Sequence, residues 1–153
     1  MSAPNIHAVK TWLLSLQSNI VSAIEDVDGK SFIKDAWERP EGGGGISRLI
    51  EEGNVLERGG VVYKRQVAGR PWEAMGVSLV FHPRNPYAPT VHMNVRFFTT
   101  TGPSKDPVWW FGGGMDLTPY YGFTEDAIHF HQTCHDALTP FGADLHHQFK
   151  QWC

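Results

Sequence analysis

The sequence predicts an α+β fold, with a helix at the start, a series of strands in the middle and helices again at the end. Three observations support this prediction. Apolar residues recur at helical spacing before residue 29, alternate with polar residues around residue 95, and return to helical spacing after residue 124. Clusters of glycine and proline separate the central segments and favour an antiparallel meander. The 153 residues are enough for a single domain with a hydrophobic core.

Residues 5–26 are predicted to form an amphipathic helix that ends near Gly29. Its apolar residues recur at helical spacing and therefore share one face: Val9, Trp12, Leu13, Leu16, Ile20 and Ile24. A shorter helix is predicted through Phe32, Ile33 and Trp37. It should stop before Pro40, because the residue that precedes a proline disfavours helical geometry.

Six short strands are predicted in the middle of the chain, over residues 46–50, 54–57, 60–63, 76–82, 91–99 and 108–112. Turn signals at Glu52-Gly53-Asn54 and Gly59-Gly60 separate the first three. Prolines cannot occupy a central strand, so Pro83, Pro86 and Pro89 mark the loop between the fourth and fifth.

Helical spacing returns over residues 125–138, with Thr124 as the expected N-cap and two acidic residues, Glu125 and Asp126, in the first turn. The stripe expected to face inward consists of Ala127, Ile128, His131, Cys134, His135 and Leu138. A last helix is predicted from about Gly142. The sequence stops within its apolar pattern and without a cap, so we expect the chain to be one part of a longer protein.

Composition excludes several classes of protein. The net charge of −3 and the absence of a basic stripe argue against general nucleic-acid binding. No run of about 18 apolar residues predicts a membrane span, and the first residues resemble neither a signal peptide nor a transit peptide. Two cysteines predict a reducing compartment rather than a disulfide framework. Six tryptophans and nine phenylalanines suit either a flat apolar ligand or a well-filled core.

The segment from Val91 to Phe98 carries the clearest candidate site. Its odd positions are apolar, whereas its even positions up to residue 96 are His92, Asn94 and Arg96. Such alternation predicts a half-buried strand whose second face presents an imidazole, an amide and a guanidinium, about 7 Å apart. Pairing with residues 76–82 would add two further polar side chains to this face, Ser78 and His82. The pattern favours binding of an anionic ligand, and the alternative is a solvated sheet face.

Two glycine-rich segments and one histidine pair leave alternatives open. Gly42–Gly45 suits either a backbone that approaches a ligand or a flexible connector. Trp109–Asp116 combines aromatic residues, three glycines and an acid, and Asp116 is a candidate either for the site or for a turn or helix cap. His131 and His135 have a spacing that can hold a metal, yet a buried, hydrogen-bonded histidine is the more common structural role.

Several motifs, taken together and in order, resemble the oxygen-dependent coproporphyrinogen III oxidase family. They are Glu41-Gly-Gly-Gly-Gly-Ile-Ser, Ala74-Met-Gly-Val-Ser, His82-Pro-Arg-Asn-Pro, His92-Met-Asn-Val-Arg-Phe-Phe, Trp109-Trp-Phe-Gly-Gly-Gly-Met-Asp-Leu-Thr-Pro, Glu125-Asp-Ala-Ile-His-Phe-His and Lys150-Gln-Trp-Cys. The resemblance implies a large, mostly antiparallel sheet with helices on both faces, in a homodimer. It implies oxidative decarboxylation of two propionates of coproporphyrinogen III to vinyl groups in haem synthesis, with release of carbon dioxide and hydrogen peroxide.

The resemblance also implies roles for individual residues. His92 matches the proposed proton donor, and Asp116 matches the acid that holds the pyrrole N–H groups. Substrate contacts are implied at Ser78, Asn94, Val95 and Arg96, with Arg96 also expected to support catalysis. O₂ is the implied co-substrate and no organic cofactor is implied. A divalent metal would be held by His82, His92 and His131.

The chain departs from the family pattern in two places. The segment over residues 63–72 is shorter than its counterpart, and the family continues beyond residue 153. The second functional hypothesis is therefore a catalytically incompetent porphyrin-binding fragment. A metal-dependent hydrolase is a weaker third, because no HExxH motif occurs. The expected location is the cytoplasm, with the mitochondrial intermembrane space as the alternative.

Overall fold

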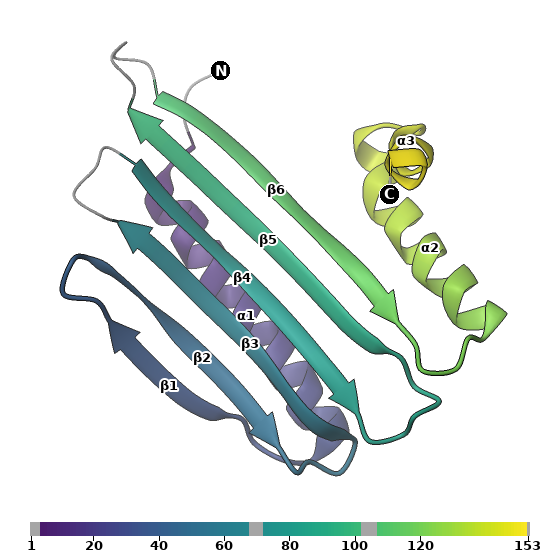
Figure 1. The fold of residues 1–153 in the computed structure, drawn as a ribbon. Helices are drawn as coiled ribbons and strands as arrows, with labels where there is room; N and C mark the ends of the chain where they lie inside the picture. The colour runs from purple at the N-terminus through teal and green to yellow at the C-terminus, as the bar shows by residue number, and fades with distance from the viewer. Residues whose placement is uncertain (1–3, 68–71, 102–106, 153) are drawn as a thin grey trace.

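The computed structural model describes residues 4–67, 72–101 and 107–152, and these form one large antiparallel sheet with flanking helices (Figure 1). Each strand pairs with the next one along the chain, in the order β1 to β6. The α+β fold with a large antiparallel sheet flanked by helices is therefore confirmed. The elements are α1 (Ile6–Asp28), β1 (Ile33–Glu38), β2 (Gly43–Glu51), β3 (Leu56–Val67), β4 (Trp72–Pro83), β5 (Thr90–Thr101), β6 (Pro107–Thr118), α2 (Thr124–Leu138), a 3₁₀ turn η1 (Thr139–Phe141) and α3 (Leu145–Trp152).

Helix α1 crosses one face of the sheet, which we call the covered face, and Figure 1 shows no helix across the other, which we call the open face. The predicted helix is confirmed at both ends. Asn5 caps it by accepting hydrogen bonds from two backbone N–H groups of the first turn, and Gly29 ends it in the left-handed region at φ 77°. Leu13 and Val21 are buried against the sheet, whereas Gln17 donates to the carbonyl oxygens of Ile46 and Val61.

The hydrophobic core lies between α1 and the covered face. Side chains of successive strand residues point to opposite faces, so each central strand contributes every second residue to this core. The residues of β3, β4 and β5 that are buried there are Val61, Tyr63, Met75, Val77, Leu79, Phe81 and Phe97. The intervening residues of the same strands face the open side, and the strand register therefore decides which side chains can form a site.

The predicted short helix through Phe32 and Trp37 is wrong, because residues 33–38 form strand β1 at the edge of the sheet. β1 pairs along its whole length with β2, and its Trp37 lies opposite Gly45. A Cβ atom at Gly45 would meet Cζ2 of Trp37 at 2.5 Å, so glycine is needed there to accommodate the indole ring. Tertiary pairing has overridden the local apolar spacing. The glycine run is thus neither a flexible connector nor a free loop: Gly42 makes the hairpin turn and the rest enters β2.

The predicted break at Gly59-Gly60 is also wrong, because β3 runs through both glycines. A Cβ at Gly59 would meet the Phe81 ring at 2.7 Å, so this glycine makes room for a neighbouring side chain rather than for a turn. The predicted turn at residues 52–54 is confirmed as the β2–β3 hairpin, where Glu52 adopts a φ of 54°. The loop containing the prolines is confirmed after Pro83, the last residue of β4.

The side chain of Asp28 fixes the β2–β3 hairpin to the end of α1. Its carboxylate accepts hydrogen bonds from the backbone N–H groups of Asn54, Val55 and Leu56, at 2.8–3.0 Å. Burial by itself would raise the pKa of this carboxyl, but these three donors and the nearby Lys30 ammonium outweigh it and lower the pKa. Asp28 therefore acts as a charged anchor between helix and sheet.

Strand β6 is longer than predicted and continues to Thr118, so Asp116 belongs to a strand and is neither a turn nor a helix cap. β6 forms the edge of the sheet opposite β1, and its side chains are largely exposed. Its aromatic residues nevertheless contact the sheet: Trp109 packs against the core, and Phe111 lies 4.8 Å from Phe97 between ring centroids.

The two C-terminal helices lie beyond the β6 edge (Figure 1). Phe123 occupies the cap position of α2, so the expectation that Thr124 is the N-cap is wrong; Thr124 is the first helical residue. The stripe that was expected to face inward is not buried, because every described side chain of α2 is at least partly exposed to solvent. α2 packs mainly on η1 and α3.

Among the described residues, every helix is too short or too polar to span a membrane. Residues 68–71 of the shortened segment and Cys153 lie outside the described residues.

Candidate functional site

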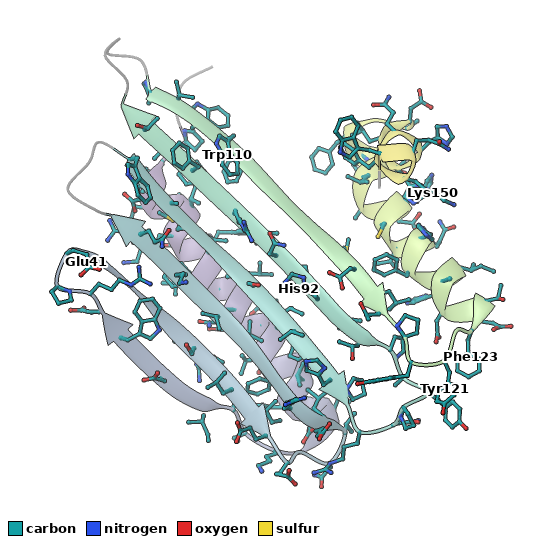
Figure 2. The ribbon with its side chains drawn as sticks, viewed as in Figure 1. Glu41, His92, Trp110, Tyr121, Phe123 and Lys150 are labelled. Atoms are coloured by element: carbon teal, nitrogen blue, oxygen red, sulfur yellow. The ribbon has the colours of Figure 1, made fainter. Side chains whose placement is uncertain are left out.

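The open face gathers the polar residues of the candidate site from three adjacent strands. Ser78 lies opposite Asn94, and His92 lies opposite Asp116, so β4, β5 and β6 present these side chains to the same side of the sheet. Arg96 follows two residues after Asn94 on this face. Figure 2 shows His92 midway along the sheet. The pairing that the sequence required for a single polar patch is therefore present.

Three side chains form a hydrogen-bonded relay across these strands. Nδ1 of His92 lies 3.0 Å from Oδ2 of Asp116, and Nε2 of the same ring lies 3.4 Å from Oγ of Ser78. An ionised carboxylate can only accept, so Nδ1 carries the proton and Nε2 is left as the basic nitrogen. The Thr118 hydroxyl donates to Oδ1 of Asp116 at 3.3 Å. The Asp116 carboxylate is thus held from two sides and orients the imidazole.

A hollow of about 970 Å³ lies over the open face. This volume is at the upper end of the range for small-molecule sites, roughly 300–1,000 Å³. It is lined by Ser78, His82, His92 and Arg96, as the sequence suggested, and also by Lys64, Phe98 and Trp110, which the sequence reasoning did not assign. Phe98 shares the even-numbered face of β5 with His92, Asn94 and Arg96, and this position could have indicated it. Lys64 is found only through the register of β3 with β4.

Asn94 and Gly114 form the least obstructed part of this face. They lie opposite each other on β5 and β6, and a Cβ atom added at Gly114 would meet no atom within 4 Å. Packing within the described residues therefore does not require glycine at this position. Among the same residues, the Asn94 carboxamide has no hydrogen-bond partner. An open floor beside an unpaired amide suits close approach of a ligand.

Val95 differs from the other predicted contact residues. Its side chain points to the covered face and packs against the core, between Asn94 and Arg96 of the open face. Val95 is part of the lining of the hollow, and because its side chain points away, it reaches the hollow through its backbone. Any role in binding must therefore come from main-chain atoms, most of which are engaged in the ladders with β4 and β6.

The comparison with known families agrees with these motifs. The family model described as coproporphyrinogen III oxidase matches residues 8–153, nearly the whole chain. The chain belongs to the coproporphyrinogen III oxidase family. Its members are oxidoreductases of haem biosynthesis, and the family name gives coproporphyrinogen III as the substrate. Such a ligand combines a large ring with several carboxylates, which fits an open face that carries both aromatic and cationic side chains.

The histidines that the oxidase resemblance suggested as metal ligands do not form a metal site in the described residues. His82 contacts the Thr90 hydroxyl at 3.4 Å from Nδ1, whereas both ring nitrogens of His92 are occupied by Ser78 and Asp116. His131 lies on α2. Within the described ranges, no three histidine, cysteine or acidic side chains converge in a way that could hold a metal ion. The donor set does not fit a metal, and no chemical step is assigned to one.

His131 instead belongs to a group of imidazoles between α2 and α3. Its ring centroid lies 5.5 Å from that of His146, and the His135 ring lies 5.6 Å from His146 on the other side. Partial desolvation and the two neighbouring histidines lower the pKa of His146. These rings support contact between two exposed helices and are separate from the relay on the sheet.

Proposed function

We propose that this chain catalyses the oxygen-dependent oxidative decarboxylation of coproporphyrinogen III, in which two propionates become vinyl groups and protoporphyrinogen IX is formed. The observation that carries the proposal is the hydrogen-bonded pair of His92 and Asp116 on an open, glycine-lined sheet face that also bears Arg96. A proton-transfer group, a carboxylate and a cation are thus available together on one surface.

The chemistry requires an oxidant and a proton acceptor. For each propionate, the C–COO⁻ bond breaks to release CO₂, the β-carbon loses one hydrogen with an electron pair, and a C=C bond forms. The electron pair passes to O₂, which takes up two protons and leaves as hydrogen peroxide. O₂ is the co-substrate in this proposal, and no organic cofactor takes part. The protein therefore has to position the ring and manage protons.

Asp116 is the group best suited to the pyrrole N–H groups. A carboxylate has about four acceptor sites, and His92 and Thr118 use two of them. The remaining sites are exposed, since the Asp116 side chain keeps 55% of its accessible surface. A fixed negative charge at the ring would stabilise positive charge that develops on the pyrrole as electrons leave, which is the electrostatic form of catalysis.

His92 is the group that moves protons. Asp116 holds Nδ1–H, so Nε2 faces the hollow as a base and becomes an acid once protonated. The Ser78 hydroxyl, 3.4 Å from Nε2, can relay the proton or contact the propionate. Arg96 lies four residues from His92 on the same strand, about 13 Å along it. At that separation, Arg96 can bind a carboxylate other than the one that reacts, through a forked pair of hydrogen bonds. Asn94 lies on the same face between His92 and Arg96.

Homodimeric assembly and a cytoplasmic location, with the mitochondrial intermembrane space as the alternative, belong to the same proposal. Both rest on the family resemblance. The exposed apolar residues of edge strand β6, including Val108 and Met115, are compatible with further contacts in an assembly.

A second candidate function follows from the connectivity of the relay. Ser78, His92 and Asp116 are linked in the order found in serine hydrolases. That chemistry also needs backbone N–H donors for an oxyanion. β4 is a central strand that pairs with β3 and β5 on its two sides, so the N–H groups around Ser78 are engaged in ladders. We therefore favour proton relay over acyl transfer, and labelling of Ser78 by a fluorophosphonate would contradict this choice.

The deciding experiment is turnover of coproporphyrinogen III by the purified chain, with and without O₂. We expect CO₂ release, peroxide formation and the fluorescence of oxidised product under air, and none of these under argon. The Asp126→Asn variant, altered on the distant helix α2, serves as a control and should retain the full rate. Saturable porphyrin binding without CO₂ release under air would contradict the proposed reaction and identify a binding module.

A further inference from the structure

One row of the sheet alternates glycines with cations. The register places Gly45, Lys64, Gly76, Arg96 and Gly112 side by side on β2 to β6. Directly opposed residues project from the same face, so Lys64 and Arg96 both point to the open side. Neighbouring strands are about 4.8 Å apart, which puts the two Cα atoms about 10 Å from each other. Both residues line the hollow.

The position between these cations carries no side chain. A Cβ atom at Gly76 would come within 3.3 Å of Cγ of Arg96, so the stem of the arginine lies against the bare glycine. On the other side of Lys64, the Trp37 indole occupies the space above Gly45. Lys64 therefore lies in the row between the position covered by the indole and the position covered by the arginine stem. Lys64, Gly76 and Arg96 all line the hollow, so a carboxylate-bearing ligand can reach both cations from the hollow.

Neither cation is neutralised within the described part of the chain. Arg65, the residue after Lys64, points to the opposite face and forms an ion pair with Glu73. Lys64 and Arg96 have no ion-pair partner among the described residues, whereas His92 on the same face is paired with Asp116. Two unpaired positive charges that share a hollow attract an anion with at least two carboxylates.

An aromatic row borders the two cations. Phe98 is stacked between Trp72 and Trp110, with centroid distances of 6.1 and 5.6 Å and interplanar angles of 20° and 18°. Phe98 and Trp110 lie one position along the open face from Arg96 and Gly112. Figure 2 shows Trp110 on β6, away from the His92 region. This end of the hollow offers apolar contact next to positive charge, which matches a pyrrole ring that carries acidic side chains.

We propose that Lys64 and Arg96 form a two-cation clamp that binds two different carboxylates of one tetrapyrrole across Gly76. Lys64 is then a positioning and specificity residue of the site, which deepens the proposed function and rests on it. The clamp selects ring systems with carboxylates on adjacent pyrroles. Arg96 and Lys64 hold one end of the ring, while Asp116 and His92 act about 13 Å further along the sheet.

Binding of coproporphyrin III, the stable oxidised form of the ligand, tests the clamp directly. Quenching of its fluorescence gives the dissociation constant for the unaltered chain and for Lys64→Met. Loss of one charged contact of about 1.4 kcal/mol weakens binding about tenfold. Lys64→Arg should restore most of the affinity. The tetramethyl ester, which has no carboxylates, should bind all three proteins equally well.

Lys34→Met is the matched control. Lys34 is also an exposed lysine of the sheet, but it lies opposite Arg48 on the covered side, so its removal changes net charge equally and should leave the dissociation constant unchanged. In turnover, Lys64→Met should raise KM about tenfold with kcat within about twofold, because it removes binding that is equal in ground state and transition state. A general disturbance of the fold would lower kcat as well.

The outcomes separate the clamp from the proposed function. Unchanged affinity in Lys64→Met, with weakened binding in Arg96→Met, overturns the clamp and leaves the function standing. Equal weakening of acid and ester binding also overturns it, because the effect then has no connection with carboxylates. If the unaltered chain neither binds coproporphyrin III nor releases CO₂ from coproporphyrinogen III under air, both proposals fail.

Discussion

On the covered face of the sheet Val61, Val77 and Phe97 are at most 1% exposed, whereas the side chains of His92 and Asp116 on the open face remain 40% and 55% exposed. The same strands supply both sets. The buried centre of the covered face is apolar and packs against α1, whereas the open face is polar and borders a hollow. It also carries two cations, Lys64 and Arg96, that have no ion-pair partner in the described ranges. One face thus supplies stability and the other supplies chemistry, and substitutions at adjacent positions should separate the two.

The largest effect should come from the adjacent pair Phe97 and Phe98. Phe97 is buried against the core, so Phe97→Ala should lower the free energy of unfolding by about 3–5 kcal/mol. Phe98 is only partly buried and stacks between two tryptophans on the open face. Phe98→Ala should cost less stability and should instead weaken porphyrin binding. Urea unfolding and fluorescence titration measure the two properties, and an equal loss of stability in both variants would contradict the division of the faces.

Asp116→Asn should raise the activation barrier by about 2–4 kcal/mol, which lowers the turnover rate roughly 30- to 1,000-fold. The amide cannot fix the His92 tautomer as a carboxylate does, and it removes the charge beneath the ring. Because Asp116 is exposed, its substitution should leave the unfolding midpoint nearly unchanged. Steady-state rates under air measure the effect. A rate within a factor of two of the unaltered chain would remove Asp116 from the mechanism.

Asp28 offers the opposite case, a carboxylate whose role is structural. Asp28→Ala leaves three backbone donors without their acceptor and should cost on the order of 3 kcal/mol of stability at pH 7. The pKa of Asp28 is lowered in the folded state, so its contribution is complete above the pKa of the unfolded chain, about 3.9. It is lost as the pH falls through the lower folded value. Unfolding curves of both proteins from pH 7 to pH 2 should therefore converge, and a constant difference would refute this account.

Gly113 and Gly114 are neighbours on β6 whose positions point to opposite faces of the sheet. A Cβ at Gly113 would collide with the carbonyl oxygen of Asn94, so Gly113→Ala should lower stability by about 1–3 kcal/mol. A Cβ at Gly114 meets nothing, so Gly114→Ala should keep stability within about 0.5 kcal/mol. It should nevertheless weaken coproporphyrin III binding, because the methyl group projects from the open face opposite Asn94. Unimpaired binding in Gly114→Ala would place the ligand elsewhere.

The smallest expected effect concerns the contact between α2 and α3. The pKa of His146 is lowered by desolvation and by His131 and His135, so the folded form binds its proton less readily than the unfolded form does. Stability of the contact is complete above the unfolded pKa, about 6.5, and declines as the pH falls below it. His146→Gln should abolish this dependence. Helical circular dichroism between pH 8 and pH 5 would detect it, and identical titrations of the two proteins would argue against the histidine contact.

The alternation of polar and apolar residues in β5 determines much of the site from the sequence alone. His92, Asn94 and Arg96 share a face because the side-chain period of a strand is two, whatever the strand pairs with. Local sequence patterns gave the wrong secondary structure where contacts with neighbouring strands determine it. Residues 33–38 have apolar spacing that suits a helix, yet pairing with β2 and the fit of Trp37 over Gly45 make them a strand. Gly59 indicated a turn, but it accommodates Phe81.

The sequence by itself therefore determined the family, the α+β class and the polar face of β5, because these depend on local period and on motifs within single segments. Tertiary structure alone decided that Asp116 meets His92 and that Lys64 shares a row with Arg96. Contacts between strands depend on register, and a shift of one residue turns every side chain to the other face. Register is set by packing across the whole sheet, which no single segment encodes.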